Sequence, residues 1–174
     1  MGGRGGSSGL NFFRYNSEIE KIRNAKTENL RVFDSNGNLV YSEGGTKGHT
    51  GYEEVDYSGK IAVHNHPKGY YPFASNTDFE TFEKSGAKEM VIVSRGYTMR
   101  LRKDPSYKNF GREGITSALR WSGGNDLLNK ARQDLVQRKI SQDQYITKVF
   151  EIHKKAAKRS GYILSYEKYK PKRK

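Results

Sequence analysis

Apolar residues recur along the chain with two different spacings, which predict short strands and amphipathic helices. The turn sequence DSNGN (34–38) separates two apolar pairs, and its Asn36-Gly37 dipeptide is typical of a tight β-hairpin. A second hairpin is expected from the strand-like runs at 89–94 and 97–102. Further short strands are expected at 61–63, which leads directly into His64, and at 162–166.

Helical spacing of apolar residues predicts helices around these strands. A polar helix over 15–26 turns Ile19 and Ile22 inward, and SNTDFETFEKSG (75–86) carries the capping residues of a second helix. The last third of the chain is helical, with apolar residues at helical spacing between Leu127 and Leu135. A capping box then opens a helix that ends at Gly161; it is formed by Ser141 and Gln144.

This order of elements predicts an α/β fold with a helical C-terminal extension. At 174 residues and 19.9 kDa the chain has the size of one globular domain with a single core. We expect a disordered glycine-rich leader at 1–11, a folded core at 12–104, a helical extension packed on the core at 105–166, and a basic tail at 167–174.

The composition excludes several kinds of site and location. The chain has no cysteine, which excludes disulfides, thiolate metal sites and a cysteine nucleophile, and favours a reducing compartment. No run approaches the roughly 18 apolar residues of a membrane span, and the opening MGGRGGSSG lacks the apolar stretch of a signal peptide. We therefore expect a soluble cytoplasmic protein with no membrane partner.

Positive charge is concentrated at the C-terminal end of the chain. The net charge is +13, and residues 148–174 hold ten lysines or arginines against two glutamates. Such a cluster favours nucleic acid or an acidic protein surface as a partner, through long-range attraction and counterion release. A solubilising tail explains the same charge, so both interpretations stay open.

Two of the four histidines stand one residue apart at the end of an apolar run. On a strand, His64 and His66 project from the same face while Asn65 points away from them. Ser75 then begins a helix whose first turn brings Asp78 back toward the histidines. Two imidazoles and a carboxylate, with water in the fourth position, form the ligand set of a catalytic zinc site. Each feature alone is an ordinary strand end or helix cap, but together they predict a metal site.

This stretch resembles the JAB/JAMM (MPN) metalloproteases, and within them the RadC-like branch, in the motif residues His64, Asn65, His66, Pro67, Gly69, Ser75 and Asp78. The similarity extends over residues 27–101, and the loop KGYYPFA (68–74) makes the spacing to the motif serine one residue longer than is usual in the family. The resemblance implies a central mixed β-sheet flanked by helices, with one zinc ion bound by the two histidines and the aspartate.

Catalytic roles follow from the same resemblance. Glu28, ahead of the first strand, would be the general base, and Ser75 would stabilise the oxyanion. Three other glutamates compete with Glu28 for the role of base, namely Glu43, Glu53 and Glu54. The remaining histidines, His49 and His153, receive no role.

The expected activity is metal-assisted hydrolysis of an amide, and the family's substrates are peptide or isopeptide bonds at the tail of ubiquitin-like modifiers. RadC-like chains are common on mobile elements, so the protein could serve a phage. The alternative is a non-catalytic basic protein of the same fold that binds nucleic acid or a nucleoprotein, for example as a phage counter-defence inhibitor. A contiguous HNH tripeptide does not match the spread motif of HNH nucleases. Zinc deaminases need a P-C-x-x-C motif, which a chain without cysteine lacks, and Ser75 does not stand in the G-x-S-x-G elbow of a serine hydrolase.

Overall fold

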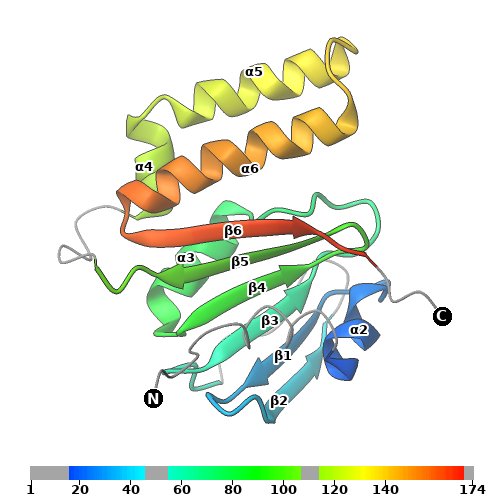
Figure 1. Ribbon diagram of the computed structural model, residues 1–174, viewed down its shortest axis with the longest axis vertical. Coiled ribbons are helices and arrows are strands. Elements are labelled where there is room, and N and C mark those ends of the chain that lie inside the picture. The colour runs from blue at the N-terminus through cyan, green and yellow to red at the C-terminus, as the bar shows by residue number, and fades with distance from the viewer. Residues whose placement is uncertain (1–15, 46–54, 107–113, 171–174) are drawn as a thin grey trace, which may run out of the picture.

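The computed structural model describes residues 16–45, 55–106 and 114–170, which form a six-stranded sheet with helices on both faces (Figure 1). The strands lie side by side in the order β2-β1-β3-β4-β5-β6. Their bounds are Asn29–Phe33 (β1), Leu39–Gly44 (β2), Ile61–Asn65 (β3), Glu89–Val93 (β4), Tyr97–Lys103 (β5) and Tyr162–Lys168 (β6). The α/β fold class predicted from the sequence is confirmed.

The sheet is mixed, because β3 and β4 run parallel while the other neighbouring pairs are antiparallel. Parallel neighbours need a crossover connection, and helix α3 (Asn76–Ser85) supplies it. The crossover leaves β3 at its carboxyl end, directly after the two neighbouring histidines. This connection therefore brings the start of α3 close to the histidines.

Both predicted hairpins are present. In the turn between β1 and β2, the Asp34 carboxylate accepts hydrogen bonds from the backbone amides of Asn36 (2.9 Å) and Asn38 (2.9 Å). Gly37 adopts a positive φ of 85°, which a side chain would strain. The second hairpin joins β4 to β5. Short polar side chains and glycine thus determine both turns locally.

Two cores of unequal size lie on the two faces of the sheet. Helix α2 (Ser17–Arg23) lies within the range predicted for the first helix and covers one face, where Ile19 and Ile22 are buried with a few valines. The larger core lies between the other face, α3 and three C-terminal helices (Figure 1). These helices are α4 (Ile115–Trp121), α5 (Gly124–Val136) and α6 (Gln142–Arg159).

The C-terminal third is part of the same sheet. β6 pairs with β5 along its whole length, from Tyr162 opposite Lys103 to Lys168 opposite Tyr97. The strand predicted at 162–166 is therefore present and continues to Lys168, so the first two residues expected in the basic tail belong to the sheet. Helix α4 lies within the helical extension predicted for 105–166, although no separate helix was predicted at its position.

A buried arginine ties the two ends of the described chain together. Arg23, at the end of α2, is 1% exposed and donates hydrogen bonds to the carbonyl of Ser94 (2.7 Å) and to the hydroxyl of Thr98 (3.0 Å). Its guanidinium lies 3.9 Å from the centre of the Tyr169 ring, just beyond β6. A buried charge is tolerated when its donors are satisfied in this way.

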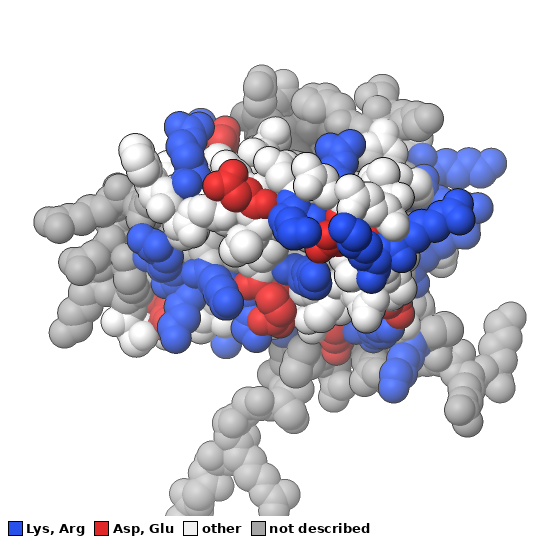
Figure 2. Space-filling model, turned by 90° about the horizontal axis from the view of Figure 1, so that it is seen from above, with Lys and Arg blue, Asp and Glu red and all other residues white. Residues whose placement is uncertain are grey.

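The surface of the C-terminal helices is basic. The face formed by α5 and α6, viewed from above, shows lysine and arginine side chains with fewer acidic ones among them (Figure 2). Residues 124–159 hold nine lysines or arginines, all exposed, against four acidic residues. Within the described ranges, no helix is both long enough and apolar enough to cross a membrane.

His153, which received no role from the sequence, is buried in the larger core. Its ring packs edge-on against Phe73 (centroids 5.6 Å apart) and Phe79 (5.2 Å), and its Nδ1 has no hydrogen-bond partner among the described residues. Burial lowers the pKa of His153 to about 4. The imidazole is therefore neutral in the folded protein at neutral pH.

The burial of His153 predicts that acid lowers the free energy of unfolding of the parent protein by a penalty that a His153→Leu variant would not have. The folded-state pKa is depressed, so the penalty is absent above the ordinary histidine pKa and grows as the pH falls toward the folded value. At pH 5 the penalty amounts to about 2 kcal/mol. Urea unfolding of both proteins in chelator should show that the unfolding free energy of the variant, relative to that of the parent, rises by this amount between pH 7.5 and pH 5. A difference in unfolding free energy that does not change with pH would contradict the burial of a neutral His153.

Candidate metal centre

Three ligand atoms converge at the carboxyl end of β3, from His64, His66 and Asp78. The Nε2 atoms of the two histidines are 3.3 Å apart. The Asp78 carboxylate approaches both, with Oδ1 3.2 Å from Nε2 of His64 and Oδ2 3.5 Å from Nε2 of His66. The histidines are 1% and 8% exposed, so the cluster is largely withdrawn from solvent.

These separations fit a tetrahedral metal ion. Two ligand atoms that each lie about 2.1 Å from a metal, at an angle of about 109°, are about 3.4 Å from each other. The two imidazole nitrogens lie within about 0.2 Å of that value, and each of them is at a similar distance from one of the two Asp78 oxygens, so a small turn of the carboxylate would bring one oxygen to both. The side chains can therefore hold a single small cation, as the sequence predicted, and their number leaves a fourth position for another ligand.

A backbone carbonyl fixes the orientation of His66. Its Nδ1 lies 2.8 Å from the carbonyl oxygen of Tyr71. Because a carbonyl oxygen only accepts, Nδ1 must carry the proton, and the lone pair of the neutral ring is then on Nε2. This is the atom that faces His64 and Asp78, so the tautomer suits a metal ligand.

The charges of the cluster support one another. Burial alone would raise the pKa of Asp78, but attraction to His64 and the hydrogen bonds that both imidazoles donate when they are protonated outweigh it and hold this pKa far below its usual range. Burial lowers the pKa of His66, but the hydrogen bond and the negative charge of Asp78 outweigh that effect and raise it. The site therefore contains a carboxylate that is ionised and favours a positive charge beside it.

Ser75 fixes the Asp78 carboxylate through a capping box at the start of α3. The Asp78 amide donates to the Ser75 hydroxyl oxygen (3.1 Å), and Oδ2 of Asp78 accepts from the Ser75 amide (2.7 Å) and from the Ser75 hydroxyl (2.7 Å). The predicted start of the helix is confirmed. The single hydroxyl proton of Ser75 is donated to Asp78, so the hydroxyl would have to rotate before it could donate to an oxyanion. The role of Ser75 as an oxyanion donor therefore stays a prediction.

Asn65 points away from the histidines, as expected, and holds the segment that carries Glu28. Its side-chain oxygen accepts from the Asn29 amide (2.7 Å), and its amide nitrogen donates to the Thr27 carbonyl (3.0 Å). From the other side, the Gly45 amide donates to the Glu28 carbonyl (2.7 Å). The backbone around Glu28 is thus fixed on both sides.

The strand register places Glu28 next to the cluster. Leu30 pairs with His64 in the antiparallel ladder of β1 and β3. In such a ladder, a residue two positions before Leu30 corresponds to a residue two positions after His64. The ladder itself ends at Leu30 and His64, and its register extended by two residues puts Glu28 opposite His66 on the same face. The negative charge of Glu28 contributes to the raised pKa of His66, which agrees with this placement.

The competing glutamates lie elsewhere or outside the described residues. Glu43 is on β2, opposite Leu30, and its carboxylate accepts a hydrogen bond from the Tyr41 hydroxyl (3.2 Å). Glu53, Glu54 and His49 lie outside the described residues. Among the described candidates, Glu28 is the one whose charge acts on a member of the cluster.

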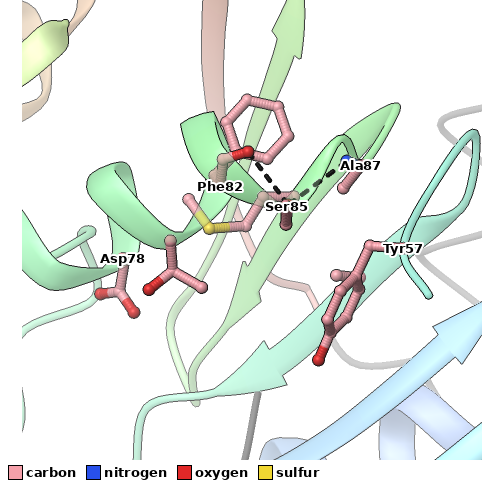
Figure 3. A pocket seen from close by; sticks show the side chains of 8 residues that line it. Tyr57, Asp78, Phe82, Ser85 and Ala87 are labelled. Carbon is pink, nitrogen blue, oxygen red and sulfur yellow. Dashed lines mark hydrogen bonds between the residues drawn. The ribbon is translucent and has the colours of Figure 1, made fainter. Parts of the chain in front are cut away.

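An apolar pocket opens beside Asp78, between α3 and the first residues of β3 and β4 (Figure 3). It is narrow: the empty space of about 260 Å³ between its walls includes the part open to solvent, and Asp78 and Tyr57 lie on opposite sides. Ser85 lines the α3 side of the pocket, and both hydrogen bonds of its hydroxyl are made within the protein. The hydroxyl donates to the Phe82 carbonyl (3.0 Å) and accepts from the Ala87 amide (3.3 Å). The pocket therefore favours an apolar group.

The comparisons with known proteins give no match, whether with models of protein families, with curated proteins or with solved structures. Arguments on function therefore depend on the site alone. Sequence reasoning missed two residues of this site. The alternation on β3 gave the direction of Asn65 but not its partners, and Tyr71 acts through a backbone carbonyl, for which the sequence carries no signal.

The geometry predicts that the purified protein binds about one equivalent of a divalent metal. Metal analysis after dialysis should find that His64→Ala and His66→Ala lose it, because each removes one of only three ligands. His153→Leu, which removes a buried histidine outside the cluster, should keep it. A folded parent protein that takes up no metal, or a His64→Ala variant that binds as much as the parent, would contradict the metal centre.

Proposed function

We propose that the protein is a zinc-dependent hydrolase of peptide or isopeptide bonds, of the JAB/JAMM kind that its motif resembles. The observation that carries the proposal is the convergence of His64, His66 and Asp78, beside a glutamate that is not itself a ligand. The two imidazole nitrogens are 3.3 Å apart, and the two Asp78 oxygens lie 3.2 and 3.5 Å from them. Two histidines, one carboxylate and an open position are the ligands of catalytic zinc. Oxygen-only sites suit magnesium or calcium better.

Zinc bound there would act as a Lewis acid that acidifies water and polarises a carbonyl oxygen. The protein's own residues would manage the protons. Glu28, opposite His66, would take a proton from the attacking water and deliver it to the leaving amine nitrogen. Asn65 would keep Glu28 in place by holding the backbone on both sides of it.

Ser75 would serve the reaction in two ways. Its hydroxyl orients the Asp78 carboxylate in the resting site. When substrate binds, rotation of the same hydroxyl would direct its proton to the oxyanion, while the Ser75 amide continues to hold Asp78. The family that the motif resembles cleaves peptide or isopeptide bonds at the tails of ubiquitin-like modifiers, and a substrate of this class is proposed for this protein.

The base is tested by Glu28→Gln, which keeps the size of the side chain and removes its proton affinity. Cleavage of a panel of extended peptides and lysine-linked isopeptides should fall by roughly 10² or more. The bound metal should stay, because Glu28 is not a ligand. Glu43→Gln is the matched control, since it makes the same change on β2, two strands from the histidines of β3 and on the same sheet face. This variant should retain activity within a few-fold.

Two results would overturn this assignment in different ways. Equal rates for the parent and Glu28→Gln would show that another group is the base. A parent protein that holds its zinc and cleaves no member of the panel would remove the hydrolase proposal itself.

A second proposal concerns the basic face of α5 and α6 (Figure 2). We infer that it binds the phosphates of nucleic acid, because the nine basic residues of 124–159 are all exposed and outnumber the four acidic ones. Seven of the nine lie on the two helices and two lie in the turn between them. Binding through phosphates depends on counterion release and therefore weakens as salt rises.

Substitution of Lys154, Lys155 and Lys158 by alanine should flatten the dependence of duplex affinity on salt, by about 0.9 in the logarithmic slope for each phosphate that is no longer neutralised. The matched control replaces three exposed bases on other elements, Lys84, Lys88 and Arg95, and should leave the slope unchanged. Titrations of a labelled duplex at several salt concentrations measure it. Equal slopes for both triple variants would exclude this face as the binding surface.

A further inference from the structure

Helix α6 meets the loop between the metal-site residues through aromatic rings. In the loop, the rings of Tyr71 and Phe73 are stacked with their centroids 5.0 Å apart. Tyr145, in the first turn of α6, is 6% exposed, and its ring lies 5.3 Å from that of Tyr71 and 6.2 Å from that of Phe73. These contacts anchor the loop to the C-terminal third of the chain.

The same helix reaches the other end of the loop. Further along α6, His153 packs against Phe73 and against Phe79, the residue that follows Asp78 in α3. Phe150 adds a contact with Phe73, with centroids 6.0 Å apart. Helix α6 therefore packs on the loop and on the first turn of α3.

Tyr71 belongs both to this aromatic contact and to the metal site. Its carbonyl oxygen accepts from Nδ1 of His66 at 2.8 Å. The carbonyl lies one bond from the Cα that bears the ring, and the peptide group is planar. A ring held against Tyr145 consequently restricts the directions in which the carbonyl can point.

We propose that helix α6 positions the metal ligand His66, with Tyr145 holding Tyr71 so that the Tyr71 carbonyl keeps His66 in its metal-binding tautomer. The inference rests on the zinc centre of the proposed function. Groups that orient a ligating histidine typically contribute 10- to 100-fold to metal affinity. Tyr145 and Tyr71 are positioning residues here, and neither touches the ion.

The loop itself supplies a matched pair of variants. Tyr71→Ala removes the anchored ring and keeps the carbonyl, whereas Tyr70→Ala removes a neighbouring tyrosine of similar exposure (46% against 43%) that contacts no other ring of the described residues. Competition with a chromophoric chelator should show zinc affinity reduced about 10-fold or more in Tyr71→Ala. Tyr70→Ala should stay within about threefold of the parent. Equal effects of the two variants would overturn the proposal.

The helix side provides the reciprocal test. Tyr145→Ala should weaken zinc binding as Tyr71→Ala does, Tyr145→Phe should restore most of the affinity because the ring returns, and the double variant should add little to either single change. Val149→Ala, one turn further along α6 and also buried, is the control for general loosening of the helix. It should lower the unfolding midpoint and leave zinc affinity unchanged. Additive effects of the Tyr71 and Tyr145 changes in the double variant would contradict the proposal that Tyr145 acts through Tyr71. A loss of zinc affinity in Val149→Ala equal to that in Tyr145→Ala would contradict it as well.

A metal-free measurement separates this inference from the zinc centre. Nitrogen-15 NMR in chelator, at a pH high enough to leave the histidine rings neutral, should show His66 protonated at Nδ1 in the parent and in Tyr70→Ala, and a mixture of tautomers in Tyr71→Ala. A parent that binds no zinc would refute the centre and the inference together. A parent that binds zinc, with the same His66 tautomer in all three proteins, would refute the positioning role alone.

Discussion

Alternation of side chains at the end of β3 is the constraint on which the whole site depends. Successive strand residues point to opposite faces, so His64 and His66 meet Asp78 on the α3 side while Asn65 reaches the backbone at the start of β1. One short strand therefore supplies two metal ligands and the group that holds the proposed base. A shift of register by a single residue would separate all of them.

Burial gives this arrangement its precision. The cluster lies where β3 leaves the sheet, and the crossover to β4 must return through α3, whose capping box holds Asp78 by two hydrogen bonds from Ser75. The C-terminal third adds a second layer of support, because β6 completes the sheet and α6 packs on the loop that contains Tyr71. Arg23 and Tyr169 then join the start of the described chain to its end.

Local sequence signals predicted much of this fold and the ligands of the candidate site. The hairpin turns, the cap at Ser75 and the i, i+2 histidines are determined by neighbouring residues, and each was found. The remaining features depend on contacts between distant segments. The burial of Arg23 beneath Tyr169, the packing of His153 against Phe73 and Phe79, and the bond from His66 to a backbone carbonyl arise only when the sheet is assembled. No pattern of residue types in one stretch could indicate them.

The most direct test of the metal centre is a crystal structure with anomalous diffraction data on both sides of the zinc absorption edge, from protein purified without chelator. We expect one strong anomalous peak that appears only above the edge, within about 2.0–2.2 Å of Nε2 of His64, Nε2 of His66 and one oxygen of Asp78. Crystals soaked in zinc that show no peak there, with the three side chains joined only by hydrogen bonds, would contradict the account.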